Sequence, residues 1–124
     1  MSSPTTNYTW HKIFNSEEEA KAAVPQRQLK LLVIDGRSVC FAHTFAGFFA
    51  VQDACPHLGH SLSKGTTNYL NEVVCPWHSY RFSLDNGKEC DWRTRNAVSY
   101  PLKTDANGLF IGIPAAITDQ TPLN

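Results

Sequence analysis

The chain has 124 residues, and its eleven basic and eleven acidic side chains cancel to a formal net charge of zero. Without a basic field, nucleic acid is not an expected partner. No apolar run is long enough to cross a bilayer, so no membrane partner is expected either. Apolar residues are 42% of the chain and charged residues 18%, a composition typical of a globular domain with its own core. We expect one domain over residues 1–124, with loose tails at 1–7 and 116–124.

The first ten residues, MSSPTTNYTW, contain neither the basic nor the apolar segment of a secretory signal peptide. We therefore expect a cytoplasmic protein whose thiols stay reduced. In such a protein, four cysteines are more often metal ligands or buried thiols than disulfide partners.

A short helix is predicted from about Ser16 to Ala23. Ser16 followed three residues later by Glu19 matches a capping box, and the first turn is acidic. Pro25 then ends the segment. No other segment has a convincing helical pattern.

The remainder of the chain predicts short β-strands separated by turns. Asp35-Gly36 and Ala46-Gly47 are turn dipeptides between apolar runs, so the first three of these strands should form a meander. The predicted strands cover residues 28–34, 38–45, 48–52, 69–75, 80–84, 97–103 and 108–113. Turns at this spacing indicate an all-β fold, either a sandwich or a barrel.

Two similar segments, CPHLGH and CPWHSY, begin at Cys55 and Cys75. Each holds a histidine shortly after the cysteine, His57 in the first and His78 in the second. Each segment follows a predicted strand, and its proline stiffens the loop. Two adjacent loops of this kind could present two thiolates and two imidazoles to one metal site.

Three interpretations of these four residues compete. They could be unrelated loop residues, but buried thiols are usually scattered rather than patterned. They could hold a structural zinc ion, although the common zinc spacing places both cysteines in one element and both histidines in another. They could instead hold a two-iron, two-sulfide cluster in which two histidines replace two cysteines on one iron. Each mixed loop would then supply one ligand to each iron, which favours the cluster.

The sequence resembles the Rieske family, whose signature is C-x-H, a spacer, and then C-x-x-H. Seventeen residues separate His57 from Cys75 here. The flanking segments LSKG, YRFSLDNGK, SYPLK and NGLFIGI are also similar to the family, and the resemblance covers roughly Leu29 to Pro114. It implies three stacked antiparallel sheets, with a small cluster-binding subdomain made by loops at about 53–62 and 73–82.

The resemblance also implies the role of each candidate ligand. Cys55 and Cys75 would bind the inner iron of one Rieske-type [2Fe–2S] cluster per chain. His57 and His78 would bind the outer iron, near solvent. Their exposed edge would be the exit for the electron.

Four positions indicate which subclass of the Rieske family the chain resembles. His60 and Trp77 stand where respiratory-chain Rieske proteins have two further cysteines joined by a disulfide. Tyr80 and Phe82 stand where those proteins have a serine and a tyrosine that bond to the cluster or its ligand. Tyr80 and Phe82 do not offer the same hydroxyl groups at the same places. Hydrogen bonds to cluster sulfur raise the reduction potential of the cluster, and this chain would lack them. We therefore expect a low potential, toward about −150 mV.

A low-potential member of this kind resembles the ferredoxins of ring-hydroxylating oxygenase systems. Such a chain is a monomeric one-electron carrier between a flavin-dependent reductase and a terminal oxygenase. It is not a catalyst by itself. Two alternatives stay open, namely the small subunit of NAD(P)H-dependent nitrite reductase and a zinc-stabilised binding module.

The remaining candidate residues are given structural or solvated roles. Cys40 and Cys90 are expected to be buried free thiols, and His11 and His43 to be structural or solvated. We expect His60 to be a solvated loop histidine and Trp77 to shield the cluster from water. Solvated charges are expected at Lys64, Arg81 and Arg93. An apolar docking patch could form from Pro56, Leu58 and Pro76.

Overall fold

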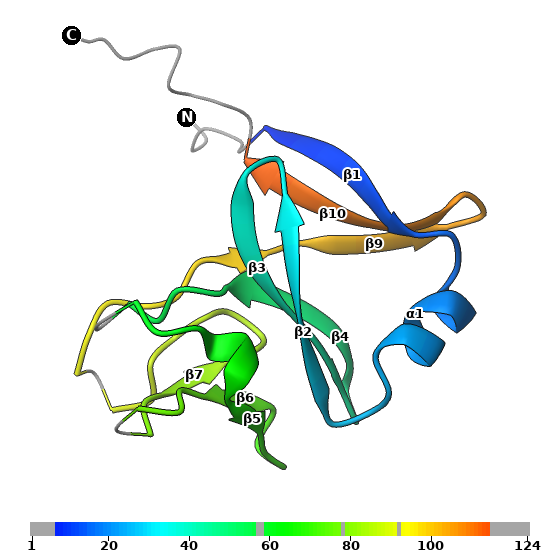
Figure 1. Ribbon diagram of the computed structural model, residues 1–124. Helices are drawn as coiled ribbons and strands as arrows, with labels where there is room; N and C mark the ends of the chain where they lie inside the picture. Colours follow the sequence, from blue (N-terminus) through cyan, green and yellow to red (C-terminus); the bar gives the residue numbers. More distant parts are fainter. Residues whose placement is uncertain (1–6, 57–58, 78, 92, 115–124) are drawn as a thin grey trace, which may run out of the picture.

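The computed structural model describes residues 7–56, 59–77, 79–91 and 93–114. Ten strands, one α-helix and one 3₁₀-helix make up this part of the chain (Figure 1). In chain order they are β1 (Tyr8–Phe14), α1 (Glu17–Ala23), β2 (Gln28–Ile34), β3 (Arg37–Thr44), β4 (Gly47–Gln52), η1 (Leu62–Lys64), β5 (Thr66–Thr67), β6 (Glu72–Val74), β7 (Arg81–Ser83), β8 (Ser99–Tyr100), β9 (Leu102–Asp105) and β10 (Gly108–Pro114).

The strands form three antiparallel sheets, with the orders β1-β10-β9, β2-β3-β4-β8 and β5-β6-β7. Figure 1 shows the β2-β3-β4 sheet between the other two, with α1 beside it. The expected all-β class, with stacked antiparallel sheets and one short helix, is confirmed. Within the described residues, no helix is both long enough and apolar enough to cross a bilayer.

Strand β3 of the central sheet is buried on both faces from Val39 onward, and its successive side chains point in opposite directions. In β3, Val39 and Phe41 lie in the apolar clusters beside the β1-β10-β9 sheet and α1. Cys40 and Ala42 lie in the other cluster, which the β5-β6-β7 sheet completes. A strand covered on both faces reads as a continuous apolar run, as SVCFA does here. The small sheet is thereby fixed to the rest of the fold through its own core.

The helix α1 begins and ends almost where the sequence predicts. The hydroxyl of Ser16 accepts a hydrogen bond from the backbone N–H of Glu19 at 3.0 Å. The carboxylate of Glu19 reaches back to the backbone N–H of Asn15 at 2.6 Å. The capping interaction is therefore confirmed, with its return bond made one residue earlier than in the usual capping box.

The segment 97–103, predicted as one strand, is two strands in the structure. Pro101 divides β8 from β9, because proline has no N–H to donate to a sheet. The carbonyl of Pro101 accepts a hydrogen bond from Gly112 of β10 at 2.8 Å. The chain thus crosses at Pro101 from the central sheet to the β1-β10-β9 sheet.

The predicted strand at 69–75 is wrong at its first three residues. The side-chain oxygen of Asn68 accepts hydrogen bonds from the backbone N–H groups of Leu70 and Glu72. Asn71 adopts a left-handed conformation with φ 61°. These asparagine turns leave Tyr69 83% exposed and delay the strand until Glu72. The sequence also missed β1, the two-residue strand β5 and η1.

Gly65 joins η1 to β5 at a point where the backbone of another segment comes very close. A Cβ atom at Gly65 would collide with the carbonyl oxygen of Val74, the residue before Cys75. The backbone N–H of Gly65 also donates to Leu62 at 2.9 Å. This contact packs the segment after the first cysteine motif against the strand that enters the second.

We predict that Gly65→Ala lowers the free energy of unfolding by about 1–3 kcal/mol, because the backbone at Val74 has to shift to admit the methyl group. Urea denaturation followed by circular dichroism measures this change. Thr66→Ala, at the exposed neighbouring position, serves as the control and should stay within about 0.5 kcal/mol of the unmodified protein. Equal effects of the two substitutions would contradict the prediction.

Candidate metal centre

The two cysteine motifs form loops with the same closing hydrogen bond. In the first, the backbone N–H of Cys55 donates to the carbonyl of His60 at 2.8 Å. In the second, the backbone N–H of Cys75 donates to the carbonyl of Tyr80, also at 2.8 Å. Each loop therefore opens at its cysteine and closes five residues later. The repeated sequence pattern corresponds to a repeated backbone turn.

Each loop has a residue in the left-handed backbone conformation at the same place, four residues after the cysteine. Gly59 has φ 80° and Ser79 has φ 54°. Glycine adopts this conformation readily, whereas a serine there carries a steric cost. The two loops are thus matched in conformation although their residues differ.

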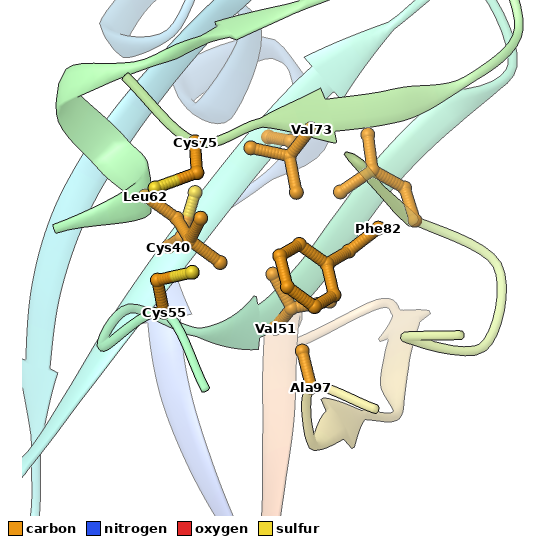
Figure 2. Packing of buried hydrophobic residues seen from close by; sticks show 10 residues of the cluster. Cys40, Val51, Cys55, Leu62, Val73, Cys75, Phe82 and Ala97 are labelled. Atoms are coloured by element: carbon orange, nitrogen blue, oxygen red, sulfur yellow. The ribbon is translucent and has the colours of Figure 1, made fainter. Parts of the chain in front are cut away.

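Both cysteine side chains are buried, with Cys55 2% and Cys75 1% exposed. They belong to the apolar cluster that includes Cys40, Leu62 and Phe82. In Figure 2, Cys40 and Leu62 lie at the same end of this cluster as Cys55 and Cys75. A thiolate in such surroundings is costly unless a cation compensates its charge. Two cysteines buried in one cluster are therefore either neutral thiols or ligands of a metal centre, and not solvated thiolates.

The other two candidate ligands, His57 and His78, lie outside the described residues, as does Leu58. The structure does describe the residues on which these loops are anchored. Cys75 directly follows β6, and Cys55 follows β4 after two residues. The prediction that each motif follows a strand is confirmed.

Asp53 anchors the first loop, a role that no motif in the sequence indicates. Its carboxylate is buried, with 5% of the residue exposed. One oxygen accepts a hydrogen bond from the hydroxyl of Ser61 at 2.5 Å, and the other from the backbone N–H of Ser63 at 2.8 Å. The backbones of Ala54 and Ser61 also form an isolated β-bridge. The residues before Cys55 and after His60 are thereby tied together.

Trp77 and His60 connect the two loops. Their rings stack with centroids 4.8 Å apart and an interplanar angle of 17°. Trp77 is nevertheless 53% exposed, so one side of its ring faces solvent, and its expected role as a shield for the cluster stays a prediction. His60 is half-buried against it, so the expectation of a simply solvated histidine is wrong. The loops face each other because an aromatic pair forms between them.

Two of the three expected solvated charges are engaged in ion pairs. Arg81 lies 3.4 Å from Glu72 and 3.9 Å from Asp91. Arg93 lies 3.3 Å from the carboxylate of Glu89, which is completely buried. The sequence could not identify this network, because Glu89 lies in a segment with no apolar periodicity to indicate burial. Lys64 is exposed, as expected.

The ligand atoms of Glu89, Cys90 and Asp91 lie within 4.8 Å of one another. The Glu89 carboxylate already accepts hydrogen bonds from the backbone and guanidinium of Arg93. A carboxylate compensated in this way has no need of a metal cation. The group is therefore part of the ion-pair network.

Cys40 is a buried free thiol, as predicted, and Cys90 is free but only half-buried. Burial raises the pKa of Cys40 far above the ordinary thiol value, and the neighbouring Asp53 carboxylate raises it further. Burial also raises the pKa of Cys90, although the Arg81 guanidinium acts in the opposite direction. His43 is structural, since its ring lies 2.7 Å from the carbonyl of Val24.

Comparison with known proteins identifies a family. The model of the Rieske [2Fe–2S] domain matches residues 9–102. The ferredoxin subunit of 3-phenylpropionate/cinnamic acid dioxygenase from Shigella boydii is 34% identical over 70 residues, covering 56% of this chain and 66% of that protein. The carnitine monooxygenase oxygenase subunit of Acinetobacter baumannii is 28% identical over 145 residues. That match covers 96% of this chain, which spans only 39% of the oxygenase subunit.

Solved structures share the fold. The ferredoxin of carbazole 1,9a-dioxygenase from Nocardioides aromaticivorans aligns with a TM-score of 0.71 at 18% identity, covering 86% of this chain and 98% of that one. A putative NADH-dependent nitrite reductase small subunit from Mycobacterium tuberculosis aligns with a TM-score of 0.74 at 19% identity, covering 89% and 99%. At these identities the likeness concerns the fold alone.

The two free thiols are expected to react differently with iodoacetamide. The thiolate is the reactive form, so the raised pKa and complete burial of Cys40 should keep it unmodified at pH 8.5 in the folded protein. The half-buried Cys90 should be modified under the same conditions. Mass spectrometry of the digested protein measures both sites, and a sample labelled in urea provides the control in which both react. Equal labelling of the two cysteines in the folded protein would contradict the burial described for Cys40.

Proposed function

The chain belongs to the Rieske [2Fe–2S] domain family, and from this premise we propose that it is a one-electron carrier of an oxygenase system. A family member of this type carries a Rieske-type [2Fe–2S] cluster. The single observation that carries the proposal is the pair of matched loops that bring Cys55 and Cys75 into one buried cluster of side chains. Such a centre stores and releases electrons without binding a substrate.

We assign the ligands as Cys55, His57, Cys75 and His78. In this assignment the two buried thiolates hold the inner iron and the two histidines hold the outer iron. The burial of both cysteines supports the inner position, because protein surrounds them. The donor set of two thiolates and two imidazoles is that of a Rieske centre.

Cys55, His57, Cys75 and His78 would hold the cluster, which would supply one-electron transfer between redox partners with no bond made or broken. The protein keeps water from the sulfur side of the centre with the apolar cluster around Cys55 and Cys75. In the second cysteine loop, Pro76 and Trp77 are exposed. We place the docking surface for redox partners on this loop, since electron-transfer encounters use small and transient interfaces.

The expected low potential fits the residues after the second motif. Phe82 has no hydroxyl group and is completely buried in the apolar cluster. It therefore cannot donate a hydrogen bond to a ligand. With fewer hydrogen bonds to sulfur, the reduced and more negative state gains less stabilisation. The potential then lies toward the lower end of the Rieske range, at about −150 mV.

The partners in this proposal are a flavin-dependent reductase, which supplies the electron, and a terminal oxygenase, which receives it. The 34% identity to a dioxygenase ferredoxin subunit supports this choice over a nitrite reductase small subunit. We propose that the carrier acts as a cytoplasmic monomer, built as one domain. Membership of the Rieske family favours an iron–sulfur centre over the zinc-stabilised module.

Replacing either proposed histidine ligand should abolish the cluster. We expect His57→Ala and His78→Ala to remove the visible absorption and the EPR signal of the reduced protein, because each leaves the outer iron with three of its four ligands. His11→Ala, in β1 and outside both cysteine loops, is the control and should keep both signals. Unchanged spectra in both ligand variants would refute the assignment, and a protein purified anaerobically without iron or acid-labile sulfide would refute the function.

Redox titration monitored by EPR tests whether the chain is a low-potential Rieske carrier. We expect a midpoint potential toward about −150 mV. A second titration of Phe82→Tyr, which adds a hydroxyl at this position, should give a higher potential than the unmodified protein. A potential well above zero in the unmodified protein would contradict the assignment to low-potential carriers.

A further inference from the structure

A carboxylate with no access to solvent lies in the segment that follows β7. The side chain of Glu89 is 0% exposed. Burying a charge of this kind is costly unless it is paired and hydrogen-bonded. Nothing in the proposed electron transfer uses Glu89 directly, so its burial calls for a structural explanation.

Glu89 is paired with Arg93 through backbone and side chain together. One carboxylate oxygen accepts a hydrogen bond from the backbone N–H of Arg93 at 2.5 Å. The other lies 3.3 Å from both Nε and Nη2 of the guanidinium. It also accepts from the backbone N–H of Asp91 at 3.2 Å. The carboxylate thus fixes both the turn of residues 89–93 and the direction of the Arg93 side chain.

The guanidinium held by Glu89 covers the second cysteine loop. Its central carbon lies 3.8 Å from the centroid of the Tyr80 ring, close enough for a cation–π contact. One of its nitrogens also lies 3.5 Å from the carbonyl of Ser79. Tyr80 is the residue whose carbonyl accepts the hydrogen bond from the backbone of Cys75. Arg93 therefore rests on the closing residues of the loop.

We propose that Arg93, oriented by the buried Glu89, is a positioning residue that clamps the second cysteine loop shut and places a fixed positive charge beside it. We call these three residues, Glu89, Arg93 and Tyr80, the loop clamp. Glu89 binds and orients Arg93, and the planar guanidinium of Arg93 packs on the ring of Tyr80. The carbonyl of Tyr80 in turn accepts the hydrogen bond from the backbone of Cys75. The clamp deepens the proposed function, on which its effect on the potential rests.

The charges of the loop clamp should shift the reduction potential of the centre in directions that can be measured. Reduction adds one negative charge to the centre, and a nearby cation stabilises it. Removing the charge of Arg93 should therefore lower the potential. Removing the charge of Glu89 leaves Arg93 with only the more exposed Asp91 carboxylate, 3.6 Å away, as its anionic partner, and should raise the reduction potential. If the clamp only held the loop in place and its charges did not act on the centre, the two substitutions would not shift the reduction potential in opposite directions.

Hydrogen exchange tests the positioning role without requiring the cluster. We expect Arg93→Met to speed amide exchange in the peptide containing Cys75 and Tyr80 by about three- to tenfold, as loss of a cation–π contact and its anchor implies. Arg95→Met is the matched control. It removes the same charge two residues away, at an exposed position for which the described part of the chain gives no ion pair. Equal exchange in the two variants would overturn the clamp.

Measurements of the reduction potential and the conservative variant Arg93→Lys complete the test of the loop clamp. We expect a lower potential in Arg93→Met than in Arg95→Met, and a higher potential in Glu89→Gln than in the unmodified protein. Arg93→Lys keeps the cation but loses the planar group, so it should restore most of the potential but not the slow exchange. Shifts of the same sign in Arg93→Met and Glu89→Gln would overturn the charge role.

The two proposals fail in different ways. If the unmodified protein holds no cluster, the electron-carrier function fails, while the exchange measurement on the same protein still decides the clamp. If the cluster is present and Arg93→Met exchanges like Arg95→Met, the clamp fails and the carrier function stands. Thermal unfolding followed by circular dichroism identifies any variant that does not fold, and Arg93→Met remains decisive if Glu89→Gln is such a variant, because the Arg93 side chain is 37% exposed.

Discussion

The burial of two cysteine side chains at one end of an apolar cluster is the constraint on which the arrangement of the two cysteine loops depends. In the proposed ligand assignment these two cysteines are thiolates, and a thiolate pair enclosed by protein needs a positive centre to compensate its charge. The surrounding chain is arranged to bring the pair together. Each cysteine begins a loop that closes on itself through one backbone hydrogen bond, so the position of the sulfur is set by local geometry as well as by the core.

The central sheet supplies the platform for this arrangement. Because β3 is covered on both faces, its residues link the core around the cysteines to the core under the β1-β10-β9 sheet. Gly65 and Asp53 then tie the first loop to the second and to the sheet. The loops that carry the chemistry are therefore held on a rigid support, although they lie at the surface.

Local signals in the sequence predicted the parts of the structure that depend on neighbouring residues. The helix cap at Ser16, the meander from Gln28 to Gln52 and the paired cysteine motifs are of this kind. The parts that the sequence missed depend on distant partners. β1 becomes a strand by pairing with β10, almost a hundred residues later in the printed sequence. Glu89 is buried because Arg93 compensates its charge, which no hydrophobic pattern reveals.

The stacked rings of Trp77 and His60 join the two cysteine loops without a covalent bond. An aromatic pair of this kind contributes about 1 kcal/mol, which is close to thermal energy. Its strength does not depend on whether the surrounding solution is oxidising or reducing. The contact between the two cysteine loops is therefore the same under oxidising and reducing conditions, and its opening needs no thiol–disulfide chemistry.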